Sequence, residues 1–146
     1  MPAYLPPTSL NQLLPYVVLI DDDEDDISSL SIALLAHGIQ TYCFASVEDA
    51  MNYIRLITDK RLLPALIISD YSMPKLNGEQ LLAVVKANKD MCQIPVVLYS
   101  TGMTPVLRSY LIEHGALECF AKPWTLVAFA AQVLVFKSMA LESSLQ

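Results

Sequence analysis

The chain has 146 residues, of which 54% are hydrophobic and 16% are charged. This length suits one domain with a single core, and this composition excludes a disordered tail. One run of six acids, Asp21 to Asp26, accounts for the net charge of −6, because the other nine acids balance the nine bases. With no basic stripe in the sequence, we predict no nucleic-acid partner.

The mean hydropathy of +0.43 raises the question of a membrane span. The most apolar segment, Trp124–Phe136, is interrupted by Thr125 and Gln132 and is shorter than the ~20 residues that a span needs. The first residues carry no base ahead of an apolar run, so we predict no signal peptide. Three widely spaced cysteines without a CxxC motif argue against a zinc site or a disulfide framework. We therefore expect a protein of the reducing cytoplasm with no membrane partner.

Residues 1–15 hold four prolines and no clear period, which predicts an irregular N-terminal arm. A single domain over 16–140 and a C-terminal tail over 141–146 follow. Within the domain, short apolar runs alternate with helical periods. The runs predict strands at 16–20, 39–44, 66–69, 94–99 and 117–121. The helical periods predict helices around 27–37 and at 47–58, 78–88, 105–114 and 126–140.

Local signals mark the starts of several of these helices. Ser46 is a good N-cap, and Asn77 with Gln80 three residues later resembles a capping box. Thr104 followed by Pro105 is typical of an N-cap with proline at the first helical position.

The strands are apolar throughout, which indicates a sheet covered on both faces. We predict an α/β fold with a five-stranded parallel doubly wound sheet, flavodoxin-like (βα)5, in strand order 2-1-3-4-5. Asp21 and Asp22 follow the first strand and Asp70 follows the third. Ser100 ends the fourth strand and Lys122 follows the fifth. All five therefore converge on one edge of the sheet.

Three carboxylates at one sheet edge repel one another, so such a cluster either raises a pKa or binds a cation. A pocket of carboxylates, a backbone carbonyl and waters suits Mg²⁺. A lysine opposite the carboxylates can pair with an aspartate or with a phosphoryl group. Together these groups suit phosphoryl transfer to an aspartate, which depends mostly on positioning and charge neutralisation.

The ordered motifs VLIDDDEDD, LIISDYSMPKLNGEQLL, IPVVLYS and HGALECFAKPW resemble the receiver domain of two-component response regulators, over about residues 16–138. The resemblance implies that Asp70 is the phosphoacceptor. It implies that Asp22 is a direct Mg²⁺ ligand, that Asp21 acts mainly through water, and that the backbone carbonyl of Ser72 is a further ligand. Ser100 then corresponds to the switch hydroxyl and Lys122 to the lysine that contacts the phosphoryl group.

The resemblance also implies partners: a sensor histidine kinase or histidine phosphotransfer protein as donor, and a downstream protein target. It implies a stand-alone signalling domain, not an enzyme, that assists only its own phosphorylation and dephosphorylation. The wide apolar face of the last helix indicates either deep burial or an interaction surface. We therefore carry the hypothesis of a homodimer through the fourth helix, fifth strand and fifth helix.

The pattern departs from the family at one switch position. An aromatic residue usually stands three residues before the lysine, whereas here that residue is Cys119 and Phe120 follows it. The family also implies a cis Lys122–Pro123 peptide. Two alternatives stay open: a pseudo-receiver that binds partners without phosphorylation, which Cys119 favours, and a haloacid-dehalogenase-type phosphatase, to whose first motif Asp21 and Asp23 are similar.

Overall fold

The computed structural model describes residues 15–144, so the predicted N-terminal arm lies outside the described residues except for Pro15. Strands and helices alternate along this part of the chain, as predicted. They are β1 (Tyr16–Ile20), α1 (Glu24–Ala36), β2 (Gln40–Phe44), α2 (Val47–Arg55), the 3₁₀ helix η2 (Lys60–Leu62), β3 (Leu66–Ser69), α3 (Gly78–Ala87), β4 (Val96–Ser100), α4 (Pro105–Glu113), β5 (Glu118–Ala121) and α5 (Leu126–Ser144).

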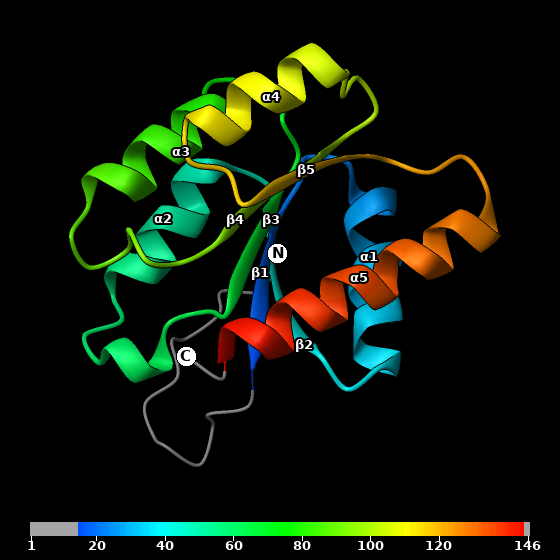
Figure 1. Cartoon of the computed structure of the whole chain (residues 1–146). Helices are drawn as coiled ribbons and strands as arrows, with labels where there is room; N and C mark the ends of the chain where they lie inside the picture. Colours follow the sequence, from blue (N-terminus) through cyan, green and yellow to red (C-terminus); the bar gives the residue numbers. More distant parts are fainter. Residues whose placement is uncertain (1–14, 145–146) are drawn as a thin grey trace.

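The five strands form one parallel sheet in the order β2-β1-β3-β4-β5, which confirms the predicted topology. Helices α1 and α5 cover one face of this sheet, and α2, α3 and α4 cover the other (Figure 1). Strand β1 lies between β2 and β3, and its last residue, Ile20, pairs with Ser69 of β3. The segments that follow β1 and β3 therefore begin side by side at the carboxyl edge of the sheet.

Alternation along the strands divides the core into two halves. Val17 and Leu19 of β1 pack with buried residues of α1 and α5, whereas Val18 and Ile20 pack with those of α2, α3 and α4. All four side chains are at most 1% exposed. Because both faces are dry, the apolar runs continue without polar alternation until the strand ends, and the first polar groups appear at the sheet edge.

The predicted N-caps are confirmed. The Ser46 hydroxyl accepts from the backbone N–H of Asp49 at 3.1 Å. Asn77 and Gln80 form the reciprocal capping box at the start of α3. The Thr104 hydroxyl accepts from the Leu107 N–H, and Pro105 follows Thr104 as the first residue of α4. These caps satisfy backbone donors that the first helical turn leaves without partners.

Two helix ends differ from the prediction. Helix α2 ends at Arg55 instead of residue 58, and the Asp59 side chain caps η2 by accepting from the Arg61 N–H at 2.9 Å. Helix α5 passes residue 140 and continues to Ser144, so helix occupies most of the predicted tail. Its sequence contains no glycine or proline to end it earlier.

The longer α5 also changes the apolar segment considered in the sequence. Leu126–Ser143 is long and apolar enough to cross a membrane by length and composition alone. Its inner residues Val133, Phe136 and Ala140 are buried against the sheet. The Lys122–Pro123 peptide is trans, contrary to the cis form expected from the resemblance, since residues 15–144 contain no cis peptide bond. Trans is the lower-energy isomer of an X–Pro bond.

Candidate phosphoryl-acceptor site

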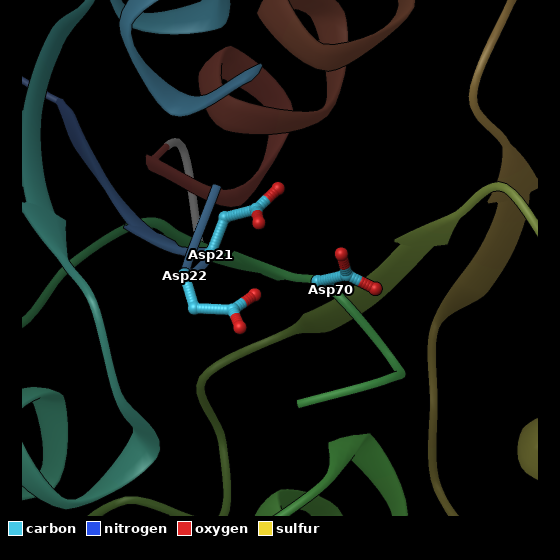
Figure 2. A group of neighbouring side chains, drawn as sticks. All are labelled: Asp21, Asp22 and Asp70. Carbon is cyan, nitrogen blue, oxygen red and sulfur yellow. The ribbon is translucent and has the colours of Figure 1, made fainter. Parts of the chain in front are cut away.

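The parallel register brings the predicted acidic residues together. Beyond the Ile20–Ser69 pair, the Asp70 N–H donates to the Ile20 carbonyl at 2.8 Å. Asp21 and Asp70 therefore leave neighbouring strands at the same level. Carboxylate oxygens of Asp21, Asp22 and Asp70 lie within 4.8 Å of one another (Figure 2). The structure thus assembles at one sheet edge three acids that are up to 49 positions apart in sequence.

The two adjacent acids after β1 differ in environment. Asp21 is buried at 8% exposure, whereas Asp22 is exposed. Burial raises the pKa of Asp21 and the nearby Asp70 charge adds to this. The Lys122 ammonium and the Asp23 N–H oppose the shift by stabilising the carboxylate. Asp22 thus offers the accessible carboxylate, while Asp21 is held by the protein.

Lys122 is the cationic counterpart of this cluster. Its ammonium donates to Oδ2 of Asp21 at 2.7 Å, of Asp26 at 2.9 Å and of Asp70 at 3.1 Å. The lysine side chain is only 9% exposed. Burial alone would lower the pKa of Lys122, but its hydrogen bonds to Asp21 and Asp26 outweigh burial and raise the pKa above its ordinary value. The ammonium is therefore a permanent positive charge beside Asp70.

Ser72 and Ser100 both lie at this edge of the sheet. The Ser72 N–H donates to Oδ1 of Asp70 at 3.0 Å, which fixes the loop after β3 around this carboxylate. Ser100 is the last residue of β4 and is 2% exposed, and its carbonyl accepts from the Lys122 N–H at 3.1 Å. Among the described residues, the Asp70 carboxylate has Ser72 and Lys122 as its hydrogen-bond donors; the Ser100 hydroxyl is not one of them.

Two residues of the site were missed by the sequence analysis. Asp26, which the sequence analysis treats only as the last of six consecutive acids, reaches Lys122 from the first turn of α1. Tyr99, treated only as a strand residue, places its ring 5.7 Å from the Lys122 ammonium. Burial raises the pKa of Tyr99 to about 12, although Lys122 opposes the shift. Which residues of α1 and β4 face Lys122 depends on where α1 begins and on the exact register of β4. The sequence pattern defines neither.

The donor set fits a hard divalent cation. Carboxylate oxygens of Asp21, Asp22 and Asp70 converge, and a backbone carbonyl such as that of Ser72 is the remaining donor type that Mg²⁺ takes in proteins. The oxygens of Asp21 and Asp70 that face Lys122 or a backbone N–H each retain a second lone pair. In the described part of the chain the cluster also contains no sulfur or imidazole ligand, which favours Mg²⁺ over zinc.

The region around Cys119 lacks an aromatic side chain at the expected position. Cys119 is 3% exposed and packs with the α2–α4 half of the core, next to α4 residues. Phe120 points to the opposite half and contacts Phe136 of α5 edge-on, with ring centroids 5.8 Å apart. Alternation along β5 therefore prevents Phe120 from replacing an aromatic residue at 119. Burial also raises the pKa of the Cys119 thiol to about 11.

Comparison with known proteins agrees with this geometry. Residues 17–134 match the response regulator receiver domain family. The two-component response regulator ORR8 of Oryza sativa subsp. indica is 30% identical over 113 residues, which cover 77% of this chain and 90% of that protein. The chain therefore belongs to the response regulator receiver family of two-component signalling, and this assignment replaces the phosphatase alternative.

Two solved structures share the fold. The Mn²⁺-bound form of the response regulator Rcp1 has a TM-score of 0.72 at 23% identity and covers 86% of this chain and 93% of its own. The beryllofluoride-activated NtrC4 receiver domain dimer has a TM-score of 0.71 at 23% identity and covers 90% of this chain and 100% of its own. At these identities the likeness concerns the fold alone.

We expect Asp22→Asn to weaken Mg²⁺ binding at least tenfold, because it removes the most accessible charge of the carboxylate cluster. The matched control is Asp25→Asn, which removes one charge from the same acidic run at an exposed position outside the carboxylate cluster. Its effect on Mg²⁺ affinity should stay within about twofold, as expected for a screened surface charge. Isothermal titration with Mg²⁺ measures both. Equal losses in the two variants would argue against Asp22 as a ligand.

Proposed function

We propose that Asp70 accepts a phosphoryl group from a phosphohistidine of a sensor kinase or histidine phosphotransfer protein, with Mg²⁺ bound. The observation that carries this proposal is the Lys122 ammonium, held 3.1 Å from Asp70 within a three-carboxylate cluster at the sheet edge. In the transfer, an Asp70 oxygen forms a bond to phosphorus and the donor N–P bond breaks. The electron pair of the broken bond leaves with the imidazole.

The surrounding residues have separate roles in this proposal. Asp21, Asp22, Asp70 and the Ser72 carbonyl would hold Mg²⁺, which neutralises charge on the transferring phosphoryl group. Lys122 neutralises charge from the opposite side, and the Ser72 N–H orients the acceptor carboxylate. The Ser100 hydroxyl is buried at the end of β4, where a small movement of the following loop would bring it to a phosphoryl oxygen.

The result is a signalling event and not catalytic turnover of a substrate. A phosphoryl group adds a charge of about −1.5 to −2 and new acceptor oxygens at the site. We infer that Ser100 and Lys122 bind these oxygens and shift the β4–α4 loop, which alters the face formed by α4, β5 and α5 for a downstream target. The chain assists only its own phosphorylation and dephosphorylation. Its three free cysteines support placement in the reducing cytoplasm.

A small donor with a P–N bond tests the chemistry without knowledge of the kinase. Phosphoramidate with Mg²⁺ should convert the protein to a phosphorylated form, seen as a slower band on a phosphate-affinity gel. Adding EDTA should prevent the conversion, because no cation then neutralises the phosphoryl oxygens. Mg²⁺ binding without any conversion would favour the pseudo-receiver alternative, to which Cys119 points.

We also propose that two copies associate through the α4–β5–α5 face. Large apolar side chains are exposed there, among them Val106 of α4 at 82%, Leu117 at 51% and Val127 of α5 at 83%. Patches of this kind mark interaction sites. The NtrC4 receiver, a relative in fold, is an activated dimer, which supports a second copy as the occupant.

Val106→Glu should therefore weaken association of the beryllofluoride-treated protein at least tenfold, since it places a charge in an apolar contact. The control Leu56→Glu changes an equally apolar residue, 67% exposed, at the end of α2. Sedimentation velocity over a concentration series measures both. A wild-type protein that stays monomeric when activated would contradict the dimer.

A further inference from the structure

Asp26 is the unexpected partner of the Lys122 ammonium. It lies in the first turn of α1, where the Asp23 side chain caps the helix by accepting from the N–H groups of Asp25 and Asp26. This cap directs the Asp26 carboxylate toward the sheet edge, where its Oδ2 accepts from Lys122 at 2.9 Å. The length of this contact lies between those of the Lys122 bonds to Asp21, 2.7 Å, and to Asp70, 3.1 Å.

The hydrogen-bonding capacity of the ammonium is fully used. An ammonium has three N–H donors, and Asp21, Asp26 and Asp70 each accept one. A phosphoryl group on Asp70 brings further acceptor oxygens to the same place. Because phosphorylation turns the Asp70 carboxylate into an acyl phosphate, the N–H that Lys122 donates to Asp70 passes to the new group. Lys122 can donate to a second phosphoryl oxygen only if it releases Asp21 or Asp26.

The two remaining carboxylates differ in how easily they can be released. The side chain of Asp21 is 10% exposed, whereas that of Asp26 is 47% exposed. A buried carboxylate that loses its cation keeps an uncompensated charge, which is strongly unfavourable. A half-exposed carboxylate gains water in its place, so its ion pair is worth little. Asp26 is therefore the partner that Lys122 loses at the lowest cost.

We infer that Asp26 is the exchangeable counter-ion of Lys122. It holds the ammonium beside unphosphorylated Asp70 and leaves when a phosphoryl oxygen takes its place. Asp26 thus positions the lysine, and by competing with the phosphoryl group it lowers the stability of the phosphorylated state. This inference rests on the proposed function of Asp70 and concerns a residue outside the acceptor and metal-ligand set.

Beryllofluoride, a phosphoryl mimic, tests the exchange in saturating Mg²⁺. The reporter is the fluorescence of Trp124, the one tryptophan of the chain, two residues after Lys122. Asp26→Asn should bind beryllofluoride about threefold to fivefold more tightly than wild type, because the competing carboxylate is gone. The control Asp25→Asn removes the same charge from the same helical turn but is not an ion-pair partner of Lys122 in the described structure. Its affinity should equal that of wild type.

A double-mutant cycle separates the exchange from a structural effect. In the Lys122→Gln background, Asp26→Asn should leave beryllofluoride affinity unchanged, since no ammonium remains to be released. Equal affinities of Asp26→Asn and Asp25→Asn, with normal binding by wild type, would overturn the inference alone. A gain that persists without Lys122 would also overturn it. Failure of wild type to bind beryllofluoride would overturn the proposed function, and this inference with it.

Discussion

Replacing Lys122 with glutamine should lower the free energy of unfolding by about 3 kcal/mol when divalent cations are removed by EDTA. The ammonium is 9% exposed and bonds to Asp21 and Asp70, which are 10% and 13% exposed. Breaking a buried ion pair leaves its partner uncompensated, which costs about 3–5 kcal/mol. The expected value is at the lower end because Asp26 is half exposed and water can solvate it.

Mg²⁺ should restore most of this lost stability. The cation would supply positive charge to Asp21 and Asp70 in place of the ammonium, and a ligand that binds only the folded state stabilises it. Urea unfolding with EDTA and with saturating Mg²⁺ measures the difference. The control is Lys60→Gln, whose ion pair with Asp90 is 4.0 Å long and largely exposed and should contribute under about 0.5 kcal/mol. A loss of equal size with and without Mg²⁺ would contradict the proposed metal site.

Removing the Phe136 ring should destabilise the fold by about 3–5 kcal/mol. Phe136 is fully buried in the α1–α5 half of the core. Its ring meets Tyr99 edge-on, with centroids 5.2 Å apart, and Phe120 at 5.8 Å. Phe136→Ala loses the buried area and both aromatic contacts, and it leaves a cavity where α5 meets the sheet. For a domain of this size such a loss is a large share of total stability.

The control for this change is Leu134→Ala in the same helix. Leu134 is 51% exposed, so its truncation should change the free energy of unfolding by less than about 1 kcal/mol. Urea unfolding of both variants measures the contrast. A Phe136→Ala protein within 1 kcal/mol of wild type would mean that α5 does not contribute the core contacts described here.

The strand ends and the carboxylate cluster could be predicted because the sequence marks them directly. Each buried strand is an apolar run, and polar residues of the site stand where a run stops, as Asp21 and Asp70 do. Given parallel strands, these ends must meet at one edge. The convergence of Asp21, Asp22 and Asp70 follows from that argument, whereas the strand order was predicted as the common flavodoxin-like one; both are confirmed.

The contact between Asp26 and Lys122 could not be predicted in the same way. It depends on which of six consecutive acids caps α1, since a shift of one residue rotates the helix by a large angle. The structure places the cap at Asp23, and only then does the Asp26 carboxylate reach Lys122, which lies 96 residues further along the chain. The end of α2 was missed for a related reason, because the Asp59 cap starts η2 in competition with the helix.

The most direct test of the acceptor assignment is the intact mass of the protein after incubation with acetyl phosphate and Mg²⁺. We expect wild type to gain one phosphoryl group and to gain none when EDTA is present. Asp70→Asn should gain none under either condition, while the control Asp59→Asn, in the turn before η2, should be labelled as wild type is. A phosphoryl group that is still gained by Asp70→Asn would contradict the account, because the acceptor would then be another residue.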